Sequence, residues 1–184
     1  MENTKDKITE AAIGILNEDP SAALERIANK AGVTRRTLHR YFADRAELIH
    51  ACGSAVQQKC KSAMLEALAS SKDPLVQLEH ILYAGIDCGA KYSLFHKTHM
   101  KEDHHHHHGN EDCAAFDSLS SRFSKLITTL MDQGKISNRL SVEWVKMFFA
   151  SVVEATVNST EYGVVANKSL RQFAWFSFSK GIGM

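Results

Sequence analysis

The chain of 184 residues has only two prolines, and both stand where a helix can begin. Pro20 and Pro74 cost no backbone hydrogen bond there, because the first N–H groups of a helix have no partner within it. No run of about 18 apolar residues is present, which argues against a membrane-spanning helix. The N-terminus also lacks the apolar core of a signal peptide. Strand-like alternation is nowhere sustained, so the sequence predicts an all-α fold.

The chain also lacks an excess of charge of either sign. Lys and Arg total 22 against 21 Asp and Glu, a net charge of +1. This balance excludes a polycation, so nucleic-acid binding would require a local basic patch. The four cysteines (Cys52, Cys60, Cys88, Cys113) form no CxxC motif and predict free, mostly buried thiols in a reducing, cytoplasmic setting. A hydrophobic content of 44% is enough for a packed core and excludes a disordered or disulfide-framework protein.

Apolar residues recur at helical spacing along most of the chain and predict about nine helices. The apolar stripes fall at about 8–16, 24–31, 38–42, 48–67, 75–86, 94–100, 116–131, 145–156 and 170–178. Capping residues mark several boundaries: Thr34, Asp44, Ser141 and Ser169 begin helices, while Gly32 and Gly134 end them. Residues 101–112, which are charged and rich in histidine, are expected to form a loop.

The segment from Ala28 to Leu38 has the pattern of a helix-turn-helix motif. Small Ala28 allows two short helices to approach closely, and Gly32 permits a positive φ in the turn. Thr34 can cap the second helix. The local charge agrees with this interpretation, because residues 26–45 contain six Lys and Arg against one Asp, a net +5. The remainder of the chain is therefore about −4, the distribution expected for a discrete DNA-binding head. The alternative is a structural helix pair with a solvated basic face.

This stretch resembles the N-terminal domain of the TetR family of bacterial transcriptional regulators. The matching residues are Ile27-Ala28, Ala31-Gly32-Val33-Thr34, Thr37-Leu38, Tyr41-Phe42, Arg45, Glu47 and Leu48. The resemblance implies a DNA-binding domain over residues 1–46 and a helical regulatory domain, for ligand binding and dimerisation, over residues 47–184. It implies a non-enzymatic regulator without a cofactor, most simply a repressor that a small hydrophobic effector releases from a palindromic operator.

Helix geometry and the resemblance together assign roles in the head. The expected DNA-binding residues are Thr34, Arg35, Arg36, Thr37, His39, Arg40, Tyr41 and Arg45. Arginine pairs with guanine and threonine methyls pack on thymine, while Tyr41 and Arg45 are expected to contact phosphate. Leu38 and Phe42 are expected in the core.

An effector site is expected inside the regulatory domain, lined by large apolar side chains with a few polar groups. The candidate residues are Met64, Leu82, Ile86, Phe95, His96, His99, Phe116, Phe123, Ile127, Trp144, Met147, Phe148 and Glu154. The alternative for each is a place in the core, or for Glu154 a structural pair or a solvated position. The last two helices are apolar on more than one face, which predicts a two-fold dimer formed by them.

Five consecutive histidines occupy positions 104–108, with His96 and His99 before them and Cys113 beyond. They offer the alternative of a metal-binding or metal-responsive helical protein that uses residues 96–113, with His104, His106 and His108 as candidate ligands. A homopolymeric run does not fix a tetrahedral geometry, so a solvated loop without a metal is the simpler expectation. No nucleophile, Walker or GxGxxG motif is present.

Overall fold

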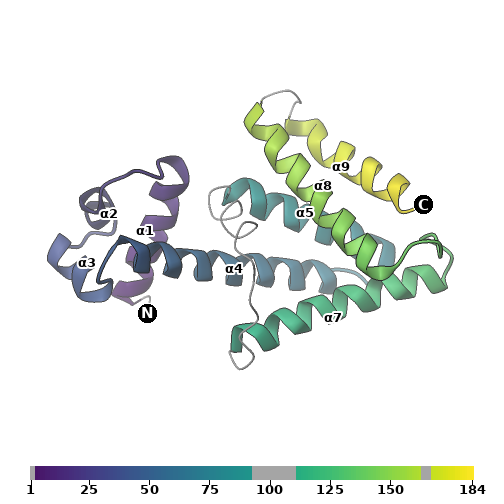
Figure 1. The fold of residues 1–184 in the computed structure, drawn as a ribbon, viewed down its shortest axis with the longest axis horizontal. Coiled ribbons are helices and arrows are strands. Elements are labelled where there is room, and N and C mark those ends of the chain that lie inside the picture. Colours follow the sequence, from purple (N-terminus) through teal and green to yellow (C-terminus); the bar gives the residue numbers. More distant parts are fainter. Residues whose placement is uncertain (1–2, 93–110, 163–166) are drawn as a thin grey trace. The chain divides into compact units, whose positions relative to one another are not determined.

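The structure is a computed structural model that describes residues 3–92, 111–162 and 167–184, and these form eight helices and no strand (Figure 1). The helices are α1 (Thr4–Glu18), α2 (Leu24–Lys30), α3 (Arg35–Tyr41), α4 (Arg45–Ala69), α5 (Pro74–Lys91), α7 (Glu111–Asp132), α8 (Val142–Tyr162) and α9 (Asn167–Gly181). The all-α prediction is confirmed. None of the helices in these ranges is both long and apolar enough to cross a membrane.

The chain divides into two compact units, and the division falls within α4, between Lys59 and Cys60. The first unit contains α1, α2, α3 and the beginning of α4. The second contains the end of α4 with α5, α7, α8 and α9. Helix α4 is continuous from Arg45 to Ala69, so no break in the chain marks a domain boundary there. The domain boundary after residue 46, expected from the sequence, stays a prediction.

In the first unit, three short helices pack through small and branched apolar side chains. Asn3 caps α1, its side chain accepting the N–H of Asp6 at 3.0 Å. The buried residues of α1 and α2 include Ile8, Ala12, Ile13, Leu16, Ile27 and Ala28. Asp44 begins α4 by accepting the N–H of Glu47 at 2.8 Å, as its spacing predicts. Glu47 returns a bond to the N–H of Ala43 at 2.6 Å, one residue before the position expected in a capping box.

In the second unit, α5 packs against α7, α8 and α9, and α8 also packs against α7 and α9. The core they share includes Leu78, Leu82, Ile127, Leu130, Val145, Phe149 and Phe178. Asp73 caps α5 through the N–H of Leu75 at 2.9 Å, with Pro74 at the first helical position. Ser141 caps α8 through the N–H of Trp144 at 3.1 Å, which confirms the predicted start of that helix.

Three expected boundaries are wrong, and one expected helix cannot be compared. Pro20 lies in the turn before α2, which begins four residues later at Leu24. Helix α9 begins at Asn167, so Ser169 lies inside the helix and is not its N-cap. Helix α7 begins at Glu111, inside the segment expected to be a loop. The expected helix at 94–100 lies outside the described residues. Gly134 does end α7, with φ +67° and the Lys135 N–H bonded to the Leu130 carbonyl at 2.8 Å.

Candidate nucleic-acid interface

The turn between α2 and α3 is closed by two backbone hydrogen bonds. The N–H of Val33 donates to the carbonyl of Ala28 at 3.0 Å, and the N–H of Gly32 donates to that of Asn29 at 3.1 Å. This pairing is a Schellman motif, which requires a left-handed residue after the helix. Gly32 supplies it with φ +69°, as the sequence predicts. The turn therefore sets the direction of α3 through local chemistry alone.

Helix α3 is capped at its beginning and anchored on one face. The hydroxyl of Thr34 accepts the N–H of Thr37 at 3.1 Å and lies 3.0 Å from the Thr37 hydroxyl. Leu38 and the adjoining Phe42 are fully buried, which confirms their expected place in the core. The opposite face presents Arg35, Arg36, His39 and Arg40 to solvent. The structure thus gathers the predicted base-reading candidates on one exposed helix face.

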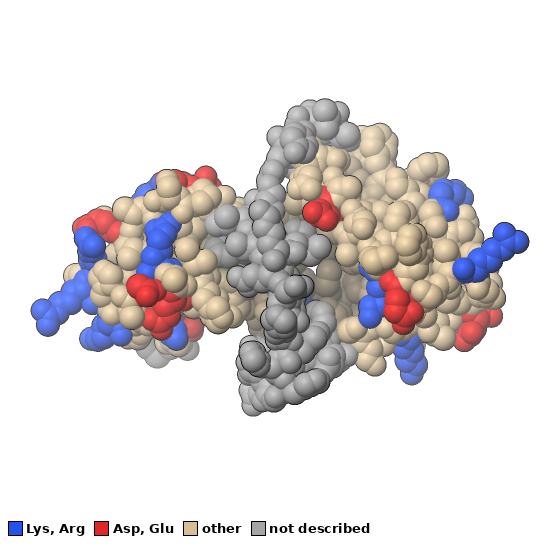
Figure 2. Space-filling view, in the orientation of Figure 1, with Lys and Arg blue, Asp and Glu red and all other residues tan. Residues whose placement is uncertain are grey.

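The basic side chains of this unit differ in how far they are neutralised. Arg26 pairs with Asp19 at 3.2 Å, and Arg35 approaches Glu25 at 3.9 Å with both side chains more than half exposed. Arg36 and Lys30 have no ion pair or hydrogen bond from their side chains to any residue that the structure describes. Figure 2 shows Lys and Arg side chains around the end of the unit where Figure 1 draws α2 and α3. A polyanion would meet uncompensated positive charge there.

Tyr41 ends α3 and is held from two sides. Its hydroxyl interacts with the side chain of Thr4 and with that of Arg40, and both contacts lower the pKa of the phenol. The guanidinium of Arg40 also lies 5.2 Å from the centroid of the Tyr41 ring. The sequence pattern contains no signal for the contact with Thr4, because it depends on how α1 packs. The phenol is thus positioned at the end of the exposed face.

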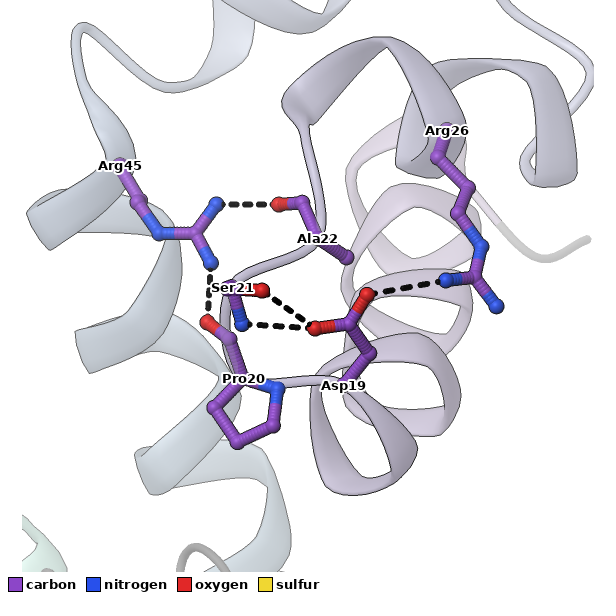
Figure 3. A network of polar contacts seen from close by, with 6 residues as sticks. All are labelled: Asp19, Pro20, Ser21, Ala22, Arg26 and Arg45. Atoms are coloured by element: carbon purple, nitrogen blue, oxygen red, sulfur yellow. Dashed lines mark hydrogen bonds and ion pairs between the residues drawn. The ribbon is translucent and has the colours of Figure 1, made fainter.

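Arg45 makes contacts that its place in the sequence does not indicate. We expected a phosphate contact, and the structure shows a bond of 2.6 Å from Nη1 to the carbonyl of Ala22 and one of 2.5 Å from Nη2 to that of Pro20 (Figure 3). Arg45 is half-buried, so these bonds hold the turn between α1 and α2 against the start of α4. The expected phosphate contact stays a prediction, and it would have to use the remaining N–H groups.

The same turn is fastened by Asp19. Its carboxylate accepts the N–H of Ser21 at 3.0 Å and the Ser21 hydroxyl at 2.6 Å, and it pairs with Arg26 (Figure 3). The bonds from Ser21, followed by the charges of Arg26 and Arg45, hold the pKa of Asp19 below its usual value. Asp-Pro-Ser is a recognisable turn sequence, so the turn was predictable although its arginine partner was not.

The effector-site candidates fall into three groups. Ile86, Phe123, Ile127 and Leu82 are buried in the core of the second unit, and Met64 and Phe148 pack against it. Trp144 and Met147 are 52% and 58% exposed, and Glu154 is also exposed. Phe95, His96, His99 and the side chain of Phe116 lie outside the described residues. The structure therefore brings only part of the set together.

The core around Met64 is closely packed. A Cβ atom added at Gly85 would lie 3.2 Å from both Met64 Cε and Val153 Cγ2. Phe149 makes edge contacts with Phe123 and Phe178, with ring centroids 4.9 and 5.7 Å apart. Side chains thus fill the space between α5 and α8 at this level.

The described parts of α8 and α9 leave large apolar side chains in solvent. Phe173 is 56% exposed and Phe176 is 64% exposed, in addition to Trp144 and Met147. Along α8, positions 144, 147, 151 and 155 follow helical spacing and form one face. The last two of these are the small residues Ser151 and Ala155. An exposed apolar face of this kind is typical of a surface that another protein covers.

The candidate metal ligands His104, His106 and His108 lie outside the described residues. In the ranges that are described, no group of three or more His, Cys, Asp or Glu residues could hold a metal ion.

Part of the first unit resembles a known protein family. Residues 8–52 match the family model described as bacterial regulatory proteins, tetR family. The chain is 34% identical over 88 residues to the HTH-type transcriptional repressor LfrR of Mycolicibacterium smegmatis. That match covers 48% of this chain and 47% of LfrR, so the chain spans about half the length of the curated relative that it matches.

Solved structures extend the likeness of the fold to the whole chain. The TetR-like transcriptional regulator LfrR from Mycobacterium smegmatis, in complex with proflavine, superimposes with a TM-score of 0.71 at 23% identity over 98% of each chain. A protein of unknown function from Rhodococcus sp. RHA1 gives a TM-score of 0.76 at 13% identity, over 100% of this chain and 97% of that one. At these identities the likeness concerns the fold alone.

Proposed function

We propose that the chain is a regulator of the TetR type that binds double-stranded operator DNA and regulates transcription, because its residues 8–52 match the tetR family model and 88 of its residues align at 34% identity with a transcriptional repressor. The observation that carries this proposal is the exposed basic face of α3, positioned by the Gly32 turn and the Thr34 cap. Such a helix fits the major groove, where base edges present a distinct pattern of donors and acceptors.

We assign the side chains of the head to two roles, the reading of base edges and the contact with phosphates. Arg36, exposed and without a partner among the described residues, reads a base edge, with Arg35, Thr37 and His39 beside it. Tyr41 and Arg40 contact the phosphate backbone and set the register of α3 on the duplex. The hydroxyl of Thr34 accepts the capping hydrogen bond of α3, so we expect Thr34 to contact the DNA through its methyl group.

A homodimer formed by α8 and α9 is the functional assembly that we propose. The exposed Trp144, Met147, Phe173 and Phe176 support it, because burying them between two copies removes apolar surface from water. Two copies related by a two-fold axis would carry two recognition helices, which need half-sites about 34 Å apart. The operator is accordingly palindromic.

Regulation takes the form of repression that a small hydrophobic effector relieves. LfrR is a transcriptional repressor, and its structure was solved with proflavine bound. Both facts support the proposal that this chain is a repressor that binds a small-molecule effector. Helix α4 contributes residues to both units, which makes it the element through which an effector would act. Linkage requires that operator DNA lower effector affinity by the factor by which effector lowers DNA affinity. The protein acts in the cytoplasm and performs no catalysis.

Selection from a pool of random duplexes with the full chain tests this proposal. We expect a palindromic consensus whose binding weakens steeply as salt rises, because phosphate contacts release counterions. The recovered duplex should bind more tightly than a scrambled duplex of the same composition. Binding that shows no preference for any duplex in the pool would overturn the proposal.

A further inference from the structure

The second unit has a surface cleft of about 310 Å³ that none of the expected effector residues lines. It lies where α4 ends, α5 begins and the middle of α7 passes. Its apolar part consists of Leu68, Pro74 and Leu126, and its polar part includes Gln77, Arg122 and Lys125. The volume is at the lower end of the range of about 300–1,000 Å³ for small-molecule sites, which suits a short ligand.

The two cations of the cleft lie three residues apart on α7 and share a helix face with Leu126. Both are exposed, and their side chains have no ion pair or hydrogen bond with any other part of the chain that the structure describes. The nearby carboxylate of Asp73 accepts the N–H of Leu75 at the start of α5 and is not among the lining residues. The positive charge of the cleft is therefore not balanced from within it.

The two other polar residues of the cleft, Gln77 and Thr129, already make hydrogen bonds within the chain. The hydroxyl of Thr129 donates to the backbone carbonyl of Lys125 at 2.8 Å. The amide nitrogen of Gln77 donates to the carbonyl of Ser71 at 2.6 Å, which fixes the half-buried side chain along the cleft wall. A ligand thus meets a fixed polar wall, an apolar floor and two cations at the rim. A molecule with an apolar body and one negative charge satisfies all three, whereas a cation or an uncharged amphiphile does not use the rim.

We propose that this cleft binds a small amphiphilic carboxylate, with its chain on Leu68 and Leu126 and its carboxylate between Arg122 and Lys125. The proposal concerns binding alone and does not depend on the DNA-binding function. A long ligand would extend beyond the cleft, so a carboxylate with a chain of medium length is the appropriate probe.

Calorimetric titration of the full chain with octanoate at low salt tests the proposal, with 1-octanol as the uncharged counterpart. We expect R122Q/K125Q to weaken octanoate binding about five- to tenfold, because two partly exposed charge contacts are lost. The matched control is K135Q/R139Q, which removes two exposed cations elsewhere in the same unit. The control should bind octanoate within about twofold of the unsubstituted chain, and octanol should bind at least about fivefold more weakly.

Methyl-labelled leucine provides a second readout that needs no substitution. Octanoate should shift the methyl resonances of Leu68 and Leu126 and leave those of Leu140 unchanged. Absence of octanoate binding, equal affinity in the two double variants, equal affinity for octanol, or shifts that spare Leu68 and Leu126 would each overturn the proposal.

Discussion

Arg45, the first residue of α4, donates a hydrogen bond of 2.6 Å to the backbone carbonyl of Ala22, 23 positions earlier in the chain. This bond, with its companion to Pro20, joins the start of α4 to the turn that leads into α2. The residue expected to contact DNA thus has a structural task within the head. The orientation of α2, and through the Gly32 turn that of α3, depends on it.

Replacing Arg45 should therefore reduce stability before any effect on DNA is considered. We expect Arg45→Gln to lower the free energy of unfolding by about 1–2 kcal/mol, since two carbonyls lose a charged donor in a half-exposed setting. The measurement is urea unfolding followed by circular dichroism. Arg35→Gln is the matched control and should change stability by less than about 0.5 kcal/mol, because its 3.9 Å ion pair is exposed. Equal effects of the two substitutions would show that the Arg45 bonds contribute nothing.

Arg36 and Tyr41 should differ in what their loss does to DNA recognition. Arg36→Ala should relax the preference for a base at about one position and cost roughly 1–3 kcal/mol on the selected sequence. Tyr41→Phe should weaken all duplexes by a similar factor and keep the salt dependence, because no charge is removed. Repeating the selection with each variant measures both effects. An unchanged consensus for Arg36→Ala would exclude its role in reading the sequence.

The exposed aromatic residues of α9 should control assembly. F173E/F176E places two charges on the proposed apolar interface, so we expect a monomer in sedimentation velocity at micromolar concentration. Binding to the palindromic duplex should fall by about a hundredfold or more, because the two heads no longer bind as a linked pair. Thr128→Glu, on the exposed face of α7, is the control and should leave the dimer intact. A dimeric F173E/F176E variant would place the interface elsewhere.

Gly181 is expected to resist substitution because of its contact with Phe148. A Cβ at Gly181 would lie 2.3 Å from Phe148 Cε1, and that ring stacks on Phe178 with centroids 5.9 Å apart. Gly181→Ala should therefore destabilise the protein by about 1–3 kcal/mol as the ring is displaced. Gly14→Ala in α1 is the control, since nothing lies within 4 Å of its Cβ, and it should stabilise by about 0.5–1 kcal/mol. Thermal unfolding distinguishes the two signs.

The buried thiol of Cys52 should make the protein less stable in alkaline solution. Burial, with a smaller contribution from Glu10, raises the pKa of this thiol from 9.0 to about 12. Above pH 9 the unfolded chain releases the proton while the folded chain keeps it, so the stabilising contribution of the neutral thiol is lost as pH rises. The decline should reach up to about 1.4 kcal/mol per pH unit between pH 9 and 12.

Comparison of urea unfolding at pH 8 and pH 10 for the unsubstituted chain and Cys52→Ala tests this expectation. The readout is the difference between the two pH values, because the substitution also changes packing at both. Burial and the hydrogen bond with Glu79 raise the pKa of Tyr83 to about 12 as well, and this residue contributes equally to both proteins. A pH dependence that Cys52→Ala leaves unchanged would contradict the assignment.

Most of the head could be predicted from the sequence because its determinants are local. The φ of Gly32, the Thr34 cap and the Asp44 cap each depend on residues within about five positions, where the type of side chain decides the backbone conformation. The burial of Leu38 and Phe42 followed from helical spacing in the same way. Helical periodicity likewise placed the core stripes of α5, α7 and α8.

The arrangement of side chains from distant elements could not be predicted in this way. Ile127 and Trp144 are both large and apolar, yet one is fully buried and the other half exposed, because composition does not say which helix faces meet. Arg122 and Lys125 become a cleft rim only where α4, α5 and α7 come together.

The sequence by itself determined most of the helices, the caps at Thr34, Asp44 and Ser141 and the recognition turn, since backbone conformation responds to neighbours along the chain. Only the tertiary structure decided that Arg45 holds the Pro20–Ala22 turn, because its partners are backbone carbonyls that carry no sequence signal and reach the guanidinium only after folding.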